Sequence, residues 1–334
     1  MTKYFSLLLA LLFSFSITAQ ETESTVSAIV EVDNDELYDA SQIGSGSIDV
    51  DELAEILTES AETDQQKAEA IYHWVTHNIA YNIKLYEDFR LGERDKKKGK
   101  RIRKSAMEEH NAGKVKKAIR NRAGICEDYA LIVNSLCQEA GLETKVVKGY
   151  IRIDPSKLRS TGEKHVWNLV KIDGEWKAID ATYGAGYLDQ YNDFVFDYDP
   201  NYFLSSKEPF SLNHLPRDTA LMLTDTIMTR RQFKNFPIIG RGFFAFDISN
   251  YQPLQVMQEV VKGEEVIVTF TSPKKIGQFT VYKDKQDEYE IVKRMKKGDE
   301  YTIVIHTKNM KTGKVMLFGD RQLIAAYRLK VNKP

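Results

Sequence analysis

Cysteine is scarce in this sequence: its 334 residues contain two, Cys126 and Cys137. Two cysteines are too few for a disulfide-stapled scaffold or for a zinc module built mainly from cysteine. A surplus of charge is also missing, because 47 Lys and Arg stand against 48 Asp and Glu. The net charge of −1 argues against a dedicated nucleic-acid binder, which needs a basic surface to neutralise phosphates.

Long apolar runs are missing as well, except at the beginning of the chain. Residues 5–15 form an apolar core behind a lysine, and S-I-T-A follows up to Ala19. This pattern is typical of a secretory signal peptide over residues 1–19, and the core is shorter than the roughly 20 residues of a spanning helix. We therefore expect export to a periplasm or out of the cell, and no transmembrane segment. Residues 20–47 are acidic and polar and are predicted to be a flexible leader.

Residues 122–129 (R-A-G-I-C-E-D-Y) have the pattern of a helix start that carries a cysteine. Beyond them, apolar residues recur at helical spacing, namely Ala130, Leu131, Val133, Leu136, Cys137 and Ala140. Gly141 suits the position just after the helix. The unpaired N–H groups and the positive dipole end of a helix favour a thiolate in its first turn, where Cys126 lies.

Both cysteines would lie on this one helix, separated by roughly 16 Å of rise. A disulfide requires Cα atoms closer than about 7 Å, so we expect two free thiols. Cys137 falls on the apolar face and is predicted to be a core residue. Cys126 is then the candidate reactive thiol.

A predicted β-hairpin supplies a histidine and an aspartate. An alternating run begins K-H-V-W-N, Asp173-Gly174 is a hairpin turn signal, and W-K-A-I-D-A-T-Y returns from Trp176. Antiparallel pairing places His165, near the start of one strand, beside Asp180, near the end of the other. A cysteine facing this pair would complete a set of nucleophile, base and orienting carboxylate.

Taken in order, G-I-C-E-D-Y-A, G-Y-I-R, H-V-W-N-L-V, D-G-E-W and I-D-A-T-Y-G resemble the transglutaminase-like superfamily. With A-I-Y-H-W-V-T-H-N-I-A-Y upstream and N-Y-F-L and N-H-L-P-R-D downstream, residues 64–236 look most like its kyphoscoliosis-peptidase branch. That branch includes cytokinesis-associated yeast proteins and bacterial secreted proteins. The resemblance implies a papain-like fold in which Cys126 is the nucleophile, His165 the base and Asp180 the residue that orients the base.

The activity implied is acyl transfer through a thioester on Cys126, with a peptide, a protein or its glutamine amide as substrate. Cell-envelope material is a further substrate class. We expect hydrolysis, as in a cysteine peptidase, over transamidation, because water is abundant outside the cell and the resemblance is to a peptidase branch. Two departures from the family pattern, Asn82 for Asp and Tyr183 for Trp, bear on substrate preference.

The alternative is a catalytically silent scaffold that binds a protein or cell-envelope partner. In that case the polar loop over residues 154–164, which leads to His165 and borders the cleft, would block the thiol. A zinc enzyme is a third interpretation, because His73 and His77 lie four apart on a predicted helix over residues 65–81. No glutamate lies between them in the zinc-protease position and no third ligand is evident, so we expect no metal and no cofactor. The sequence leaves the oligomeric state open.

The predicted fold class is α+β. Residues 48–202 are expected to form the catalytic domain, with the cysteine helix packed on an antiparallel sheet that carries the histidine and the aspartate. A charged insertion over about 84–118 contains the basic run 94–104. We interpret it as a solvated lobe, with contact to anionic cell-envelope material as the alternative.

The last part of the chain has a different pattern. Residues 203–244 are predicted to be a connector, because they show little periodicity. Residues 245–334 are predicted to form a small all-β sandwich, with an immunoglobulin-like arrangement as one form. The predicted strands are Glu265–Phe270, Gly277–Tyr282, Tyr289–Val292, Tyr301–His306, Val315–Phe318 and Leu323–Leu329.

Overall fold

The computed structural model describes residues 49–88 and 104–333, and these residues belong to one compact unit. The predicted signal peptide, the leader over 20–47 and all but the last residue of the basic run lie outside the described residues. None of the described helices is long and apolar enough to cross a membrane.

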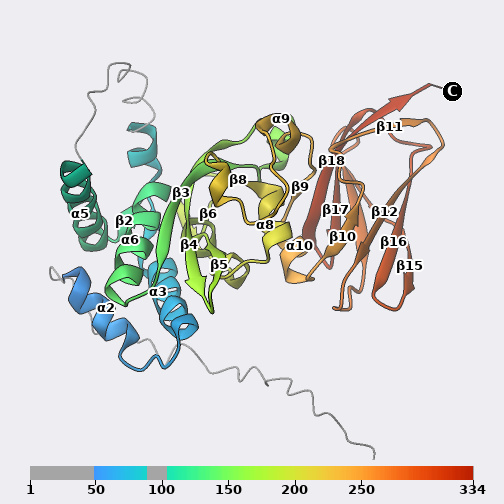
Figure 1. Ribbon diagram of the computed structural model, residues 1–334. Coiled ribbons are helices and arrows are strands. Elements are labelled where there is room, and N and C mark those ends of the chain that lie inside the picture. Colours follow the sequence, from blue (N-terminus) through green and yellow to red (C-terminus); the bar gives the residue numbers. More distant parts are fainter. Residues whose placement is uncertain (1–48, 89–103, 334) are drawn as a thin grey trace, which may run out of the picture. The chain divides into compact units, whose positions relative to one another are not determined.

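The first part of the fold contains the helices α2 (Val50–Thr58), α3 (Asp64–Asn78), α5 (Lys104–Asn121) and α6 (Cys126–Glu139). They gather beside one sheet, with α6 packed against the other three helices and against the strand β4 (Glu163–Ile172) (Figure 1). The helix predicted over 65–81 is α3. It begins at a capping box, in which Thr63 accepts from the Gln66 N–H and the Gln66 side chain accepts from the Thr63 N–H.

The sheet has the strand order β5-β4-β3-β8 and is antiparallel throughout. Its strands are β3 (Thr144–Ile151), β4 (Glu163–Ile172), β5 (Glu175–Ile179) and β8 (His214–Pro216). The predicted hairpin is β4–β5. Asp173 and Gly174 both have positive φ, 51° and 80°, as a two-residue type I′ turn requires.

Short elements connect these layers. They are β1 (Ala80–Tyr81), β2 (Ala123–Gly124), η2 (Pro155–Lys157), α7 (Ala181–Ala185), β6 (Gly186–Leu188), β7 (Phe194–Phe196) and η3 (Pro200–Tyr202). Strand β1 pairs in parallel with β2, which brings Tyr81 opposite Gly124, two residues before Cys126.

The stretch predicted as a connector contains more structure than its lack of periodicity suggests. It holds α8 (Lys207–Asn213), β8, η4 (Thr219–Leu221), α9 (Arg230–Phe233), β9 (Ile238–Ile239) and α10 (Arg241–Ala245). Elements of two to seven residues are too short to show a period. One of them, β8, joins the sheet that carries His165.

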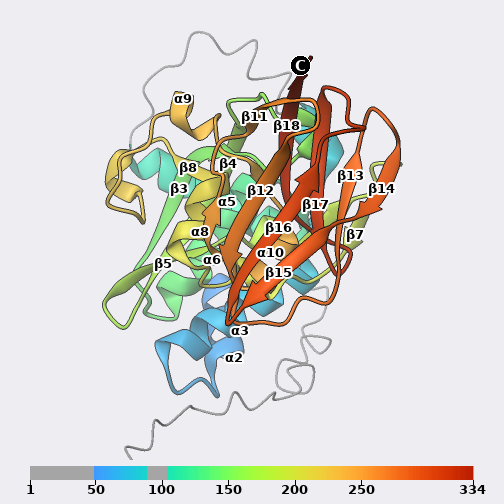
Figure 2. The ribbon, with the colours of Figure 1, turned by 90° about the vertical axis from the view of Figure 1, so that its right-hand side faces the viewer.

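Two sheets follow, and Figure 2 labels many of their strands. One sheet has the order β10-β12-β16-β15 and the other contains β11-β18-β17-β13-β14, with β9 paired to β18. Their bounds are β10 (Ser249–Gln252), β11 (Met257–Val261), β12 (Glu265–Thr271), β13 (Phe279–Lys283), β14 (Glu288–Ile291), β15 (Lys293–Lys297), β16 (Glu300–His306), β17 (Gly313–Gly319) and β18 (Gln322–Asn332). Each of the six predicted strands overlaps an observed one. The three additional strands include β15, whose residues K-R-M-K-K are all exposed and show no alternation.

Two large hydrophobic clusters hold these elements together. One lies between the helices and the first sheet and includes Trp74, Tyr129 and Trp167. The other lies between the two C-terminal sheets and includes Phe270 and Tyr301. The protein is therefore an α+β fold, with a helix-on-sheet part followed by a β-sandwich.

Candidate active site

Cys126 is the first residue of α6 and is partly exposed. The helix start before it is unusually tight, because a Cβ on Gly124 would lie 2.6 Å from the Asp128 Cβ. This closeness lets the Asp128 carboxylate accept a hydrogen bond from the Ile125 N–H at 2.9 Å. As the first helical residue, Cys126 has an N–H without an intrahelical partner, and that N–H is available to a ligand.

Glu127 carries the charge next to the thiol. It accepts hydrogen bonds from Lys114 at 2.5 Å and from Lys148 at 2.8 Å. Burial would raise the pKa of Glu127, but the two lysines lower it to about 2. The residue beside Cys126 is therefore an anion whose charge is balanced by two cations.

His165 and Asp180 meet across the β4–β5 hairpin. The His165 Nε2 lies 2.7 Å from the Asp180 Oδ2, and both side chains are buried. Asp180 follows β5 and caps α7, where its Oδ1 accepts from the N–H groups of Thr182 and Tyr183 at 3.0 and 3.3 Å. Because Asp180 engages Nε2, Nδ1 is the other His165 nitrogen, and Cys126 is near enough to contribute to the raised pKa of the ring.

The charges of this pair support each other. Burial would lower the pKa of His165, but the Asp180 carboxylate, together with Cys126, raises it to about 10. Burial would raise the pKa of Asp180, because it disfavours the charged carboxylate, but His165 and His214 hold this pKa far below its usual range. The buried arrangement is therefore an imidazolium bonded to a carboxylate.

A second histidine, which sequence reasoning did not single out, also binds Asp180. His214, at the start of β8, places Nε2 2.9 Å from the same Oδ2, and its side chain is fully buried. Its ring stacks on Phe210, with centroids 3.7 Å apart and planes 5° apart. The sequence signal was limited to one histidine in N-H-L-P-R-D, a stretch without periodicity.

Within the described residues, His165, Asp180 and His214 form the one cluster of at least three ligand-type side chains close enough for a metal, with ligand atoms within 4.8 Å. Ligands bound at about 2.0–2.1 Å to a tetrahedral zinc lie about 3.3 Å apart. The two N···O distances of 2.7 and 2.9 Å are shorter and fit hydrogen bonds. We therefore assign protons rather than a metal to this cluster.

Cys126 and His165 open onto a cleft of about 490 Å³. Aromatic side chains form much of its wall, namely Tyr81, Tyr86, Tyr183, Tyr187 and Phe194. The loop over residues 154–164 contributes Asp154, Lys157 and Ser160 to the rim, as the sequence predicts. The loop borders the cleft and leaves Cys126 among the lining residues.

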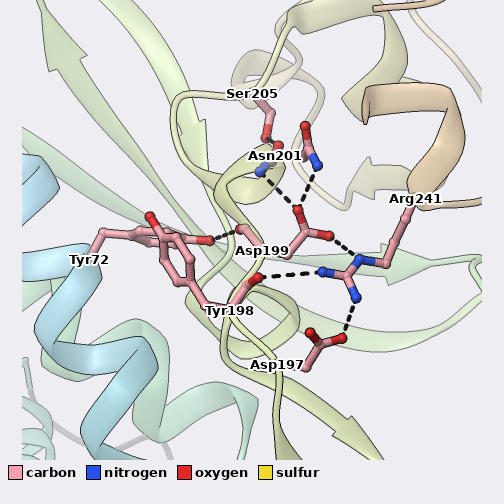
Figure 3. Close-up of polar contacts among 7 residues, drawn as sticks. All are labelled: Tyr72, Asp197, Tyr198, Asp199, Asn201, Ser205 and Arg241. Carbon is pink, nitrogen blue, oxygen red and sulfur yellow. Dashed lines mark hydrogen bonds and ion pairs between the residues drawn. The ribbon is translucent and has the colours of Figure 1, made fainter. Parts of the chain in front are cut away.

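A partly buried polar network around Asp199 holds the segment that supports the Asp180 backbone, and Figure 3 shows the residues of this network. The Asp180 N–H donates to the Tyr202 carbonyl at 3.0 Å. Asp199 lies three residues before Tyr202, and its backbone carbonyl accepts from the Tyr72 hydroxyl at 2.6 Å. The Asp199 side chain accepts through Oδ2 from the Arg241 Nε at 2.8 Å. Residues from α3 and α10 thus fix the segment against which Asp180 rests.

The other predicted candidates have ordinary environments. Cys137 is fully buried in the core, and both cysteines are free thiols, as expected from their separation on one helix. Burial raises the pKa of Cys137 to about 12. The His73 and His77 rings stack at 3.9 Å, and the His77 Nδ1 lies 2.7 Å from the His73 carbonyl.

Comparison with known proteins identifies relatives of this arrangement. Residues 51–181 match the family model described as the transglutaminase-like superfamily. The chain is 25% identical over 302 residues to human kyphoscoliosis peptidase, covering 88% of this chain and 42% of that protein. It is 25% identical over 218 residues to the Lim and transglutaminase domain protein of Caenorhabditis elegans, covering 59% and 26%. The chain spans less than half of the length of these curated relatives.

Among solved structures, the chain is similar to the crystal structure of a TGase at 16% identity. The match covers 53% of this chain and 40% of that chain, with a TM-score of 0.27.

Proposed function

Residues 51–181 carry a transglutaminase-like superfamily domain, and from this premise we propose that the protein is a thiol-dependent acyl-transfer enzyme. Cys126 is the nucleophile, His165 the general base and acid, and Asp180 the residue that orients His165. The observation that carries the proposal is the 2.7 Å bond between the His165 Nε2 and Asp180, in a cleft that also contains Cys126. The substrate class is a peptide or protein amide.

The first chemical step forms a thioester. The Cys126 thiolate attacks the amide carbonyl carbon, the S–C bond forms and the C–N bond breaks, and His165 gives its proton to the leaving amine. The unpaired N–H of Cys126 is a donor for the oxyanion of the tetrahedral intermediate. Asp180 stabilises the imidazolium and holds its tautomer.

The second step releases the acyl group. His165 takes a proton from water, the resulting hydroxide attacks the thioester, and the thiol leaves with a carboxylic acid as product. An amine in place of water would give a transamidated product through the same residues. We favour hydrolysis, because water reaches any open cleft whereas transamidation requires a second site for the acceptor amine.

Two variants test the nucleophile. Cys126→Ala should abolish amide cleavage, whereas Cys137→Ala removes a thiol that lies in the core and should retain most of it. The assay uses a denatured protein, such as casein, with and without a fluorescent primary amine. New amino termini, or ammonia released in the absence of the amine, report hydrolysis, and fluorescence coupled to the protein reports transamidation. Activity that survives in Cys126→Ala would contradict the proposal.

Iodoacetamide distinguishes an enzyme from a silent scaffold without a known substrate. At pH 7 we expect Cys126 to be alkylated at least 100-fold faster than Cys137, whose thiol is buried and protonated. The fast reaction should disappear in His165→Ala. Equally slow labelling of both cysteines in the wild-type protein would favour the scaffold.

Export of this enzyme is a further part of the proposal. The pattern of residues 1–19 supports it, and membership of the bacterial secreted branch remains a prediction. Mass spectrometry of the protein recovered outside the cytoplasm should show an amino terminus at Gln20. An uncleaved chain retained in the cytoplasm would contradict export.

A further inference from the structure

We propose that His214 is a positioning residue: its Nε2–H holds the Asp180 carboxylate in the orientation that serves His165. The inference rests on the proposed function, because it assigns a role within the same cysteine, histidine and aspartate set. It adds a residue from β8, beyond the hairpin that supplies His165 and Asp180.

The pairing of the sheet strands brings His214 close to Asp180 and His165. Strand β3 pairs on one side with β4, where Gly149 is opposite His165, and on the other side with β8, where Ile151 is opposite His214. Gly149 leaves room above the sheet, since a Cβ there would lie 2.3 Å from the Trp167 Cη2. The Trp167 ring occupies this room and meets the His214 ring edge-on, with centroids 5.1 Å apart.

Phe210 also fixes the His214 ring. Phe210 stacks on it in parallel at 3.7 Å, and the ring has no exposed surface. The titratable side chains that face His214 are Asp180 through a hydrogen bond, His165 at 5.8 Å between ring centroids and Tyr202 at 6.4 Å. A ring stacked on Phe210 and met edge-on by Trp167 keeps its Nε2 aimed at one acceptor.

The hydrogen bonds determine the protonation of His214. The ionised Asp180 carboxylate only accepts, so the Nε2 of His214 carries the proton. Burial and the charge of His165 lower the pKa of His214 to about 4, although the Asp180 carboxylate raises it, so the ring is neutral at pH 7 and its Nδ1 is bare. The structure places the Asn213 Oδ1 2.5 Å from this Nδ1 and leaves the Asn213 Nδ2 buried with no partner. A bare Nδ1 requires the reversed amide, in which Nδ2 donates to the ring and both groups are satisfied.

Asp180 consequently receives four donated hydrogen bonds. Two backbone N–H groups bind Oδ1 and two imidazoles bind Oδ2. Of the two imidazoles, His165 reaches the cleft and Cys126, whereas His214 is not among the residues that line it. The two histidines therefore have different roles. His165 carries the proton that moves during the reaction, whereas His214 donates a hydrogen bond to the carboxylate and orients it without adding a charge.

The test compares His214→Phe with His214→Gln in the full-length protein. Phenylalanine keeps an aromatic ring against Phe210 but removes the donor, whereas the glutamine amide restores a donor at the reach of Nε2. The readout is the pH profile of Cys126 alkylation by iodoacetamide, with Cys137 as an internal reporter of folding. His306→Phe is the matched control, because His306 pairs with Glu265 at 3.1 Å in the β-sandwich, away from Asp180.

We expect the midpoint of the Cys126 profile to move about one pH unit higher in His214→Phe. An Asp180 carboxylate that is no longer held toward His165 would stabilise the imidazolium and its thiolate partner less strongly. His214→Gln and His306→Phe should keep the wild-type midpoint. A phenylalanine profile that superimposes on the wild type, or equal shifts in the phenylalanine and glutamine variants, overturns the inference and leaves the proposed function intact. A wild-type Cys126 as slow as Cys137 overturns both.

A measurement on the wild-type protein does not depend on the folding of any variant. Nitrogen-15 NMR of histidine-labelled protein at pH 7 should show His214 protonated at Nε2 and bare at Nδ1, and His165 protonated at both nitrogens. A His214 protonated at Nδ1 and bare at Nε2 would overturn the inference, because such a ring cannot donate to Asp180.

Discussion

Asp180 has no exposed surface, and its carboxylate is kept ionised by its hydrogen-bond partners. A buried carboxylate without such donors would take up a proton instead. His165 and His214 differ in what they provide, because the pKa of one is raised and that of the other is lowered. Two histidines on one carboxylate therefore behave as one cation and one neutral donor.

The lowered pKa of His214 predicts acid sensitivity. Its pKa is about 4 in the folded protein and 6.5 in the unfolded chain. Between these values the unfolded state binds more protons, so the free energy of unfolding should fall as the pH is lowered from 6.5 to 4. The slope from this one group is at most about 1.4 kcal/mol per pH unit.

Urea denaturation followed by tryptophan fluorescence measures this slope. The wild-type protein should lose stability more steeply than His214→Phe between pH 6.5 and 4.5. His165 should contribute little in this window, because its raised pKa places its titration in the folded state at higher pH. Parallel pH dependences for the two proteins would show that His214 is already charged in the fold.

Among the elements, β3 and β8 illustrate how a missing side chain shapes the site. Gly149 lies between the His165 strand and the His214 strand. A Cβ at this position would lie 2.3 Å from both the Leu215 carbonyl and the Trp167 ring. Neither group can move easily, since one is backbone in the sheet and the other is a buried ring.

Gly149→Ala should therefore destabilise the protein by about 3 kcal/mol and slow Cys126 alkylation, because β8 or Trp167 must shift. Gly113→Ala is the matched control. Gly113 lies inside α5, and a Cβ at this position would have nothing within 4 Å, so alanine should stabilise by about 0.5–1 kcal/mol. Urea denaturation measures both changes, and a Gly149→Ala protein of wild-type stability would contradict the close packing of β3 and β8.

For the whole molecule, the contact between α10 and the segment behind Asp180 connects distant parts of the chain. Arg241 donates to Asp199 at 2.8 Å and also to the Asp197 carboxylate. Asp199 is 2% exposed, and its carboxylate also accepts from the Asn201 amide at 2.6 Å. Phe243 and Phe244 of the same helix belong to the hydrophobic cluster of the β-sandwich.

Arg241→Met should lower the free energy of unfolding by about 2 kcal/mol, because it leaves a buried carboxylate without its cation. It should also slow Cys126 alkylation, since Asp199 and Tyr202 belong to the segment that supports Asp180. Lys330→Met is the control: its ion pair with Glu259 is exposed and should contribute less than about 1 kcal/mol. Equal effects of the two substitutions would show that the Arg241 contact is also a surface pair.

Local rules account for much of what could be predicted. The helix at Cys126 follows from its apolar spacing, and the hairpin follows from Asp173-Gly174, whose φ values only such residues readily adopt. The period of two within β4 and β5 then determines that His165 and Asp180 can be neighbours. These features need no information from distant parts of the chain.

The sequence by itself determined the cysteine helix, the hairpin with its His165–Asp180 pair and the β character of the C-terminal part, because each is encoded by neighbours within a few residues. Only the tertiary structure decided that His214 completes the environment of Asp180 and that Arg241 supports it from α10. Strand β8 has three residues and shows no period of its own. Its place is decided by pairing with β3, more than 60 residues earlier, and by the room that Gly149 leaves for Trp167.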